Sequence, residues 1–370
     1  MNRERWIAPV VAALSFNIAA SLPAAEAQTT ARQHQEVVAK AVQFLETAQA
    51  PDGSFSADAG PAVTAIVAAG LLKNGRTADD PLVAKSLKYI EKFVRPDGGI
   101  YAEGSSHGNY ETCIAIQALE AANADGRYAK LLEGANKYVR GIQWDTEDGI
   151  DKSSPNYGGA GYGRSRRPDL SNTSFLLDAL KSLGASADDE AVQKALVFVS
   201  RTQNLESEAN TTPFAAKVND GGFYYTPAAG GSSQAGNTPD GGLRSYGSMT
   251  YAGLKSLIYA GLTSDDPRVK AATEWIKKHY TLEENPGMQA NGLYYYYQSF
   301  AKAMAAVGAD EFTDASGKKH DWRAELVAEL AKRQQPNGSW LNETPRWLEG
   351  NPNLVTGYAL LALSSAKPKP

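Results

Sequence analysis

A short motif that recurs six times along the chain constrains the fold more than any other feature. Each copy begins with a glycine turn beside an aromatic or apolar residue, and the turns are "DGSF", "DGGIY", "GGAGYG", "DGGFYY", "NGLYYYY" and "NGSW". A loop and then an apolar segment follow every turn. Repetition on this scale is typical of proteins that stack one small structural unit many times.

The apolar segments share one register. In five of them leucine stands seven residues after threonine, and the pairs are Thr64 and Leu71, Thr112 and Leu119, Thr173 and Leu180, Thr250 and Leu257, and Thr356 and Leu363. In the remaining unit Tyr297 and Met304 take these places. Segments that are apolar nearly all round are expected to form buried helices.

A more charged segment precedes the turns. In "DPLVAKSLKYIEKFV", Val83, Leu87, Ile90 and Val94 recur at intervals of three and four residues, so we expect a helix with one buried face. Each unit is then an outer helix, a turn, a loop and an inner helix. Six such hairpins predict an all-α fold, an (α/α)6 toroid around a central cavity. An open solenoid is the alternative, but neither end carries the polar capping repeat that a solenoid needs.

The first 27 residues predict a secretory signal peptide. Arg3 and Arg5 precede an apolar run, and Ala25 and Ala27 form a cleavage site of small residues. A membrane anchor is the alternative reading of this run. No later stretch approaches the roughly 20 apolar residues of a membrane span. We therefore expect an exported protein, periplasmic or secreted, with the toroid over residues 28–366 and a disordered tail over 367–370.

Composition excludes several classes of function. The formal net charge of −4 shows no basic excess, which argues against nucleic acid as a partner. Cys113 is the only cysteine, so the chain has no internal disulfide and no cysteine-rich metal site. Acid pairs such as Asp79-Asp80 and Asp265-Asp266 precede outer helices, where helix capping explains them better than metal binding. We expect neither a metal nor a cofactor.

Two of the turns resemble a known repeat. "QAPDGSF" and "QQPNGSW" are similar to the Q-x-x-x-G-x-W/F repeat of the squalene–hopene cyclase and protein prenyltransferase superfamily, in which the glutamine ties helix ends together. The other four turns keep the glycine and lack this glutamine. The resemblance extends over essentially all of the mature chain and implies the toroidal fold, but one fold hosts many functions.

The resemblance also locates a strip where the cyclases carry their acid. In those enzymes an Asp-x-Asp-Asp-Thr-Ala strip opens an inner helix, and its middle aspartate protonates an alkene. The matching strip here runs from Asp169 to Ser174, with Ser171 in the place of the proton donor. A serine hydroxyl is far too weak an acid for that step. The zinc site of the prenyltransferases is not carried over either, because Cys113 lies inside an apolar helix.

The loops before the inner helices, together with the first turn of each helix, are expected to face the cavity. Asp169 and Glu111 are candidate catalytic acids, because burial beside aromatic walls would raise their pKa values. An ion pair with Arg166 or Arg167 is the alternative for Asp169. The predicted ligand-binding residues are His107, Tyr162, Arg164, Arg167, Asn172, Asp220, Tyr224, Arg244, Tyr246, Tyr296, Trp340 and Trp347. The insertion at 226–247 is expected to be a mobile loop over one face.

Three hypotheses about function follow. The first is a toroid that binds a small-molecule, lipid-like or oligosaccharide ligand in its cavity and has lost the chemistry of the cyclases. The second is an enzyme, either a terpene cyclase-like isomerase or a polysaccharide lyase. The lyase would act on uronates through arginine, asparagine, tyrosine and histidine, with His107, Asn172, Arg164, Arg244 and Tyr246 as candidates. The third is an interaction module of the cell envelope.

Overall fold

The computed structural model describes residues 22–164 and 167–368. Twelve helices of this part of the chain form six antiparallel hairpins. The outer helices are α1 (Leu22–Ala48), α3 (Pro81–Glu91), α5 (Ala129–Arg140), α7 (Glu190–Arg201), α10 (Pro267–His279) and α12 (Trp322–Arg333). The inner helices are α2 (Pro61–Lys73), α4 (Gly108–Ala121), α6 (Leu170–Ser182), α9 (Gly247–Tyr259), α11 (Leu293–Val307) and α13 (Pro352–Ser365).

Smaller elements decorate the connections between these helices. They are the short helix α8 (Ala215–Val218), the strands β1 (Glu311–Thr313) and β2 (Lys319–Asp321), and the 3-10 turns Ala57–Ala59, Thr146–Asp148, Ala228–Gly230 and Arg346–Leu348. The two strands pair antiparallel, with Phe312 opposite His320.

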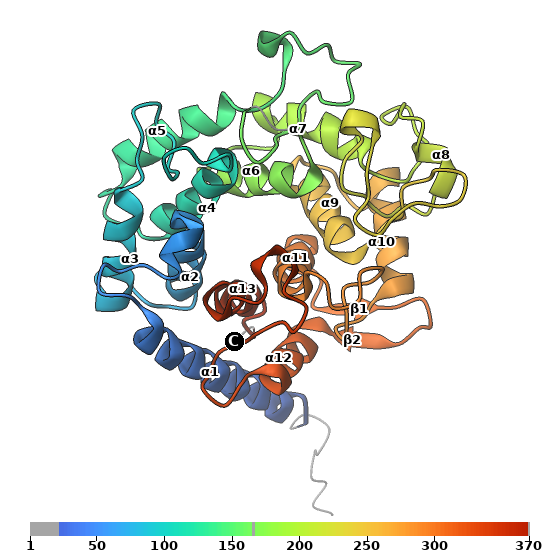
Figure 1. The fold of residues 1–370 in the computed structure, drawn as a ribbon. Coiled ribbons are helices and arrows are strands. Elements are labelled where there is room, and N and C mark those ends of the chain that lie inside the picture. The colour runs from blue at the N-terminus through green and yellow to red at the C-terminus, as the bar shows by residue number, and fades with distance from the viewer. Residues whose placement is uncertain (1–21, 165–166, 369–370) are drawn as a thin grey trace, which may run out of the picture.

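The hairpins close into a ring. Each inner helix packs on the next, and α13 returns to pack on α2 as extensively as any successive pair. Outside them, α12 packs on α1. Figure 1, seen nearly along the axis of the ring, shows the inner helices surrounded by the outer ones. The predicted (α/α)6 toroid is therefore confirmed, and the alternative of an open solenoid is excluded.

The repeated threonine joins each inner helix to the turn before it. The Thr64 hydroxyl accepts a hydrogen bond from the backbone N–H of Phe55 at 2.9 Å, and Thr112 accepts one from Ile100 at 2.9 Å. Thr173, Thr250 and Thr356 accept in the same way from Ala160, Phe223 and Trp340. In the fifth hairpin the Tyr297 hydroxyl instead donates to the carbonyl of Leu282 at 2.6 Å. The regular position of these anchor residues in the sequence therefore corresponds to one buried hydrogen bond in each hairpin.

The turn glycine touches the neighbouring hairpin. Gly158 has a φ of 81° and lies so close to α7 that a Cβ there would overlap the carbonyl oxygen of Lys194. Gly338, with a φ of 89°, lies in the same way against the carbonyl of Lys40 in α1. Only glycine combines a positive φ with such a close approach.

A glutamine accompanies four of these turns. Gln49 and Gln334 each donate to the carbonyl of their turn glycine and to a carbonyl of the neighbouring outer helix. The expectation that the other four turns lack this glutamine is wrong for two of them. Gln143 donates to Gly158 and Ala191, and Gln203 donates to Gly221 and Arg268, all within 2.9 Å. Insertions between these glutamines and their glycines hide the motif in the sequence.

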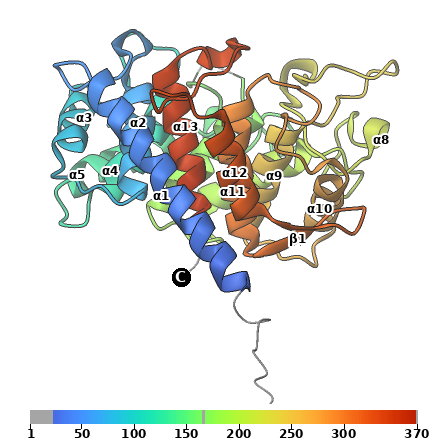
Figure 2. The same cartoon turned by 90° about the horizontal axis from the view of Figure 1, so that it is seen from below.

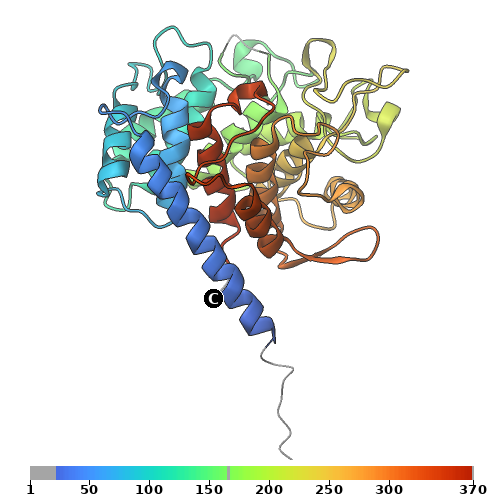
Figure 3. The same ribbon diagram turned by 60° about the horizontal axis from the view of Figure 1, so that its bottom comes forward.

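The predicted signal peptide and the predicted tail lie at the two ends of the chain, and the structure describes only part of each. Figure 3 shows α1 running along the outside of the ring, with its first turns extending beyond the neighbouring helices. Residues 1–21, most of the predicted signal peptide, lie outside the described residues, as do residues 369–370 of the predicted tail. Among the described residues no helix is long and apolar enough to cross a membrane.

Candidate functional site

A cavity of about 300 Å³ occupies one end of the ring. It lies at the amino ends of the inner helices, whose preceding loops gather along the upper rim in Figure 2, opposite the C-terminus. Each inner helix contributes the residue two places before its threonine or equivalent anchor. These six residues are Ala62, Tyr110, Ser171, Ser248, Tyr295 and Leu354. The same turn of every hairpin therefore builds the cavity wall.

Four aromatic rings from four inner helices form a closed belt within this wall. Tyr110 meets Phe175 edge to face at 5.2 Å between ring centres, and Phe175 lies 6.1 Å from Tyr295. Tyr295 meets Tyr358 at 6.1 Å, and the hydroxyls of Tyr358 and Tyr110 are 3.1 Å apart. Such edge-to-face contacts stabilise aromatic clusters. The belt presents hydrocarbon surface interrupted only by hydroxyl groups.

Ser171 lies in the cavity wall, at the place that the sequence assigns to the acid of the cyclases. Its hydroxyl is 2.9 Å from the hydroxyl of Tyr295. Burial raises the pKa of Tyr295 well above that of a free tyrosine, so the pair stays neutral. Neither group can deliver a proton to an alkene.

Asp169, two residues before Ser171, is buried and does not line the cavity. It caps α6, and its two oxygens accept hydrogen bonds of 2.8 Å from the backbone N–H and the side-chain amide of Asn172. Tyr225, which does line the cavity, also hydrogen-bonds to it. Burial raises the pKa of Asp169 to about 6. Its hydrogen bonds are to Asn172 and Tyr225, while Arg167 donates to Ser232 and acts on Asp169 only at longer range. Arg166, the other arginine considered as an ion-pair partner, lies outside the described residues.

Glu349 is a carboxylate on the cavity wall that no pattern in the sequence selects. It is 1% exposed and accepts hydrogen bonds from the backbone N–H of Tyr295 at 2.8 Å and of Tyr294 at 3.3 Å. The amide of Asn342 donates to it as well, at 2.6 Å. Burial raises its pKa. Glu349 thus fastens the loop before α13 to the amino end of α11.

The other candidate acid lies outside the cavity lining. Glu111 is 5% exposed and accepts hydrogen bonds from the backbone N–H of Ala102 at 2.7 Å and from the hydroxyl of Ser105. Its carboxylate thereby holds the loop between the second turn and α4 in place. Ordering that loop is sufficient to explain its burial.

Two side chains, one aromatic and one aliphatic, cover the mouth of the cavity. Trp347 and Leu348 line it, yet they are 44% and 59% exposed. Both have a positive φ, 56° and 64°, which is unfavourable for residues with a Cβ. Beside them the Arg346 guanidinium donates to the side chain of Gln234 at 2.7 Å, which joins this loop to the 226–247 insertion. The insertion itself carries two isolated β-bridges.

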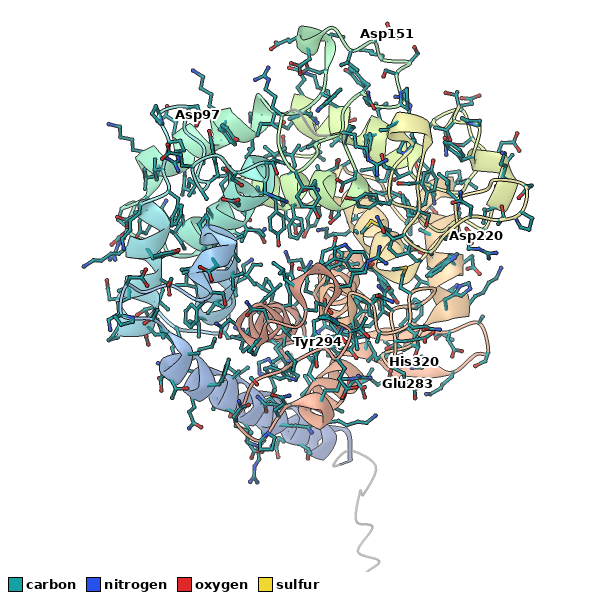
Figure 4. The ribbon with its side chains drawn as sticks, viewed as in Figure 1. Asp97, Asp151, Asp220, Glu283, Tyr294 and His320 are labelled. Carbon is teal, nitrogen blue, oxygen red and sulfur yellow. The ribbon has the colours of Figure 1, made fainter. Side chains whose placement is uncertain are left out.

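The predicted ligand-binding residues divide into two groups. His107, Tyr162, Tyr246 and Trp347 line the cavity. The other eight do not line it. Among the charged and amide residues, Arg164 pairs with Asp148, Arg167 and Arg244 are exposed on loops, Asn172 donates to Asp169 and Asp220 accepts from Trp275. The three aromatic residues donate to backbone carbonyls away from the cavity: Tyr224 to Arg201, Tyr296 to Thr281 and Trp340 to Leu330. Figure 4 shows Asp220 at the outer edge of the ring. The arginines weighed for a lyase therefore do not meet at the cavity.

Several lining residues were missed. Tyr225 and Tyr295 stand one position from the predicted Tyr224 and Tyr296, and Phe175 and Tyr358 lie two residues after their anchor threonines. The spacing relative to the anchor is the signal that identifies them. Within the described ranges, no group of three histidine, cysteine, aspartate or glutamate side chains is arranged to hold a metal ion.

Comparisons with known proteins agree with this architecture. The family described as squalene–hopene cyclase C-terminal domain matches residues 57–226. No curated protein matches the chain. The ligand-free structure of the type II terpene cyclase MstE from Scytonema is similar over 91% of this chain and 98% of its own, with 15% identity and a TM-score of 0.54. A variant of that enzyme is similar over 92% of this chain and 99% of its own, with 16% identity and a TM-score of 0.51.

The chain is thus an α/α toroid with the fold of the type II terpene cyclases. The predicted resemblance to the squalene–hopene cyclase superfamily is confirmed, by the family match over residues 57–226 and by the fold over most of the chain. Identity this low carries the fold alone, so the function has to be argued from the cavity.

Proposed function

We propose that the toroid binds a small isoprenoid-like lipid in its aromatic cavity and does not start its cyclisation by protonating an alkene. The belt of Tyr110, Phe175, Tyr295 and Tyr358 carries the proposal, because it offers aromatic surface to a hydrocarbon. Binding pockets commonly measure about 300 to 1,000 Å³, so a cavity of about 300 Å³ suits a short chain.

The polar groups of the cavity support a ligand with one polar end. Ser171, Tyr110 and Tyr358 bring hydroxyls to the wall, and the exposed His107 lies at the mouth. The arginines that would neutralise a uronate are engaged elsewhere on the surface. These features favour an alcohol or a carbonyl at the end of an apolar chain over an acidic sugar. In an exported protein such a site would carry the lipid outside the cytoplasm.

Binding to the cavity is tested with geraniol, farnesol and geranylgeraniol. Trp347 fluorescence on titration reports occupancy, and Ser171→Phe fills the space inside the belt. We expect saturable binding by the wild type, its loss in Ser171→Phe, and no change in Ser153→Phe, whose side chain is exposed on a distant loop. Equal binding by both variants would exclude the cavity as the site. Quantitative recovery of unchanged lipid would separate binding from turnover.

A second candidate function is an acid-catalysed isomerisation. The observation that favours it is Asp169, with a pKa of about 6 and a hydrogen bond to Tyr225, which reaches the cavity. The acid would be largely protonated below pH 6 and could then act through the Tyr225 hydroxyl. Product formation by the wild type that disappears in both Asp169→Asn and Tyr225→Phe would support this function. If the wild type forms no product either, binding remains the proposed role of the cavity.

A further inference from the structure

A second hollow, of about 360 Å³, lies at the opposite end of the ring. Residues five, eight and nine places after the repeated anchor line it, so it is built from the carboxyl ends of the inner helices. Its charged and amide residues are Lys73, Gln117, Asp178, Lys181 and Lys302. These residues play no part in the aromatic cavity.

A buried polar layer forms the floor of this hollow. Lys302 donates to one oxygen of Asp178 at 2.8 Å and to Gln117 at 3.0 Å, and Lys255 bonds the other oxygen of Asp178. The side chains of Lys255, Asp178 and Lys302 are 3%, 5% and 10% exposed. Burial would raise the pKa of Asp178, yet the two ammonium groups hold it at about 2. One carboxylate therefore balances two buried cations.

Lys73 adds a further positive charge. Among the described residues its ammonium group has no hydrogen bond or ion pair, although Asp178 and Glu120 act on it at longer range. Burial and the charge of Lys302 lower its pKa. Lys181 stands on the rim. Four ammonium groups thus face two carboxylates, which leaves an excess of positive charge around a hollow.

The carboxyl ends of the helices do not account for this excess. A helix carboxyl terminus stabilises a nearby cation only weakly. An uncompensated charge buried in a protein is, by comparison, strongly unfavourable. A bound anion would remove that cost, and lysine ammonium groups are common ligands of phosphate. The hydroxyls of Ser182, Ser364 and Ser365 also line the hollow, where they donate to carbonyls of their own helices, so the lysines are the groups left to bind an anion.

We propose that the second hollow binds a phosphate-sized oxyanion between Lys73 and Lys302. The site is separate from the aromatic cavity and does not depend on what that cavity binds. The oxyanion is either a free phosphate group or the headgroup of a phospholipid, and both present the same chemistry to the lysines.

Isothermal titration of the full chain with inorganic phosphate, at constant ionic strength in chloride, tests the site. We expect one site per chain, weakened about tenfold or more in Lys73→Gln, because a charge-assisted hydrogen bond is worth about 1.5 to 3 kcal/mol. Lys73→Arg should retain binding. Lys88→Gln, an exposed lysine of α3, should bind as the wild type does. Thermal melts of each variant establish that it is folded.

Sedimentation with phosphatidylcholine vesicles, with and without phosphatidic acid, distinguishes the two sources. Retention that requires phosphatidic acid and Lys73 would assign a lipid headgroup, and phosphate binding without such retention would assign the free anion. The proposal is overturned if neither phosphate nor phosphatidic acid binds, or if Lys73→Gln binds as well as Lys88→Gln. None of these readouts depends on an isoprenoid.

Discussion

The hydroxyl of Ser171 lies 2.9 Å from the hydroxyl of Tyr295, on the wall of the aromatic cavity. This pair joins α6 to α11 across the interior of the ring. The superfamily that the sequence resembles places its proton donor at this position in the strip, and here two neutral hydroxyls satisfy each other instead. The pair therefore supports the rigidity of the aromatic belt and contributes no acid.

Asp169 predicts a specific dependence of stability on pH. Its pKa is about 6 in the folded protein and near 3.8 in a free side chain, so the folded state holds the proton more tightly between these values. Its contribution is present below about pH 4 and is lost as the pH rises through 6, which reduces the free energy of unfolding by about 3 kcal/mol. Urea unfolding at several pH values should show a flatter profile for Asp169→Asn, whose amide can still cap α6. An unchanged profile would mean that Asp169 is not the titrating group.

The turn glycines predict that Gly158→Ala destabilises the toroid strongly. The added Cβ would meet the carbonyl of Lys194 in α7, and alanine would also have to adopt a positive φ. Gly126→Ala is the matched control, because its φ is also 81° but nothing lies within 4 Å. The control should cost about 1 to 2 kcal/mol from the backbone alone, and Gly158→Ala should cost clearly more in chemical denaturation. Equal losses would show that contact with α7 is unimportant.

The buried charge layer predicts a large loss of stability on removal of its carboxylate. Asp178→Asn leaves Lys255 and Lys302 without their shared anion, and breaking a buried pair in this way costs about 3 to 5 kcal/mol. Glu311→Gln removes one partner of the exposed pair with Lys319 and should cost less than about 1 kcal/mol. Adding Lys255→Met to Asp178→Asn should restore part of the loss in thermal melts. No recovery would mean that Asp178 acts through other contacts.

The strained residue over the cavity mouth predicts faster ligand exchange when it is replaced. Trp347→Gly suits the φ of 56° and removes the ring that lies against Gly292. Since glycine tolerates this backbone conformation, we expect the free energy of unfolding to change by less than about 1 kcal/mol. The dissociation rate of a bound isoprenoid, followed by stopped flow, should rise. Trp347→Phe keeps an aromatic ring there and should release ligand at a rate closer to that of the wild type.

The fold could be predicted because its defining contact repeats in one register. The hydroxyl of Thr112 and those of its equivalents make the same hydrogen bond in five hairpins, so the spacing survives loops of very different length. Gln143 and Gln203 were overlooked for the opposite reason. Their partners are fixed in space but lie far along the chain, beyond insertions.

The sequence predicted that the cavity lies before the inner helices, but two of the tyrosines chosen to line it were wrong by one position. Tyr295 lines it while Tyr296 points to the Thr281 carbonyl, because one step along a helix turns a side chain by about 100°. Tyr225 and Tyr224 likewise point to opposite sides of an extended segment. Glu349 offered no local signal, since its role depends on the amino end of a helix more than fifty residues away.

The contact between Gly338 and Lys40 has one further consequence. It joins the sixth turn to α1 through the same geometry that joins Gly158 to α7, so the boundary between the last and first hairpins is built like an internal boundary. The chain ends interrupt the polypeptide without interrupting the ring. A circular permutant with new termini in an exposed loop, and the old ends linked, would preserve every one of these contacts.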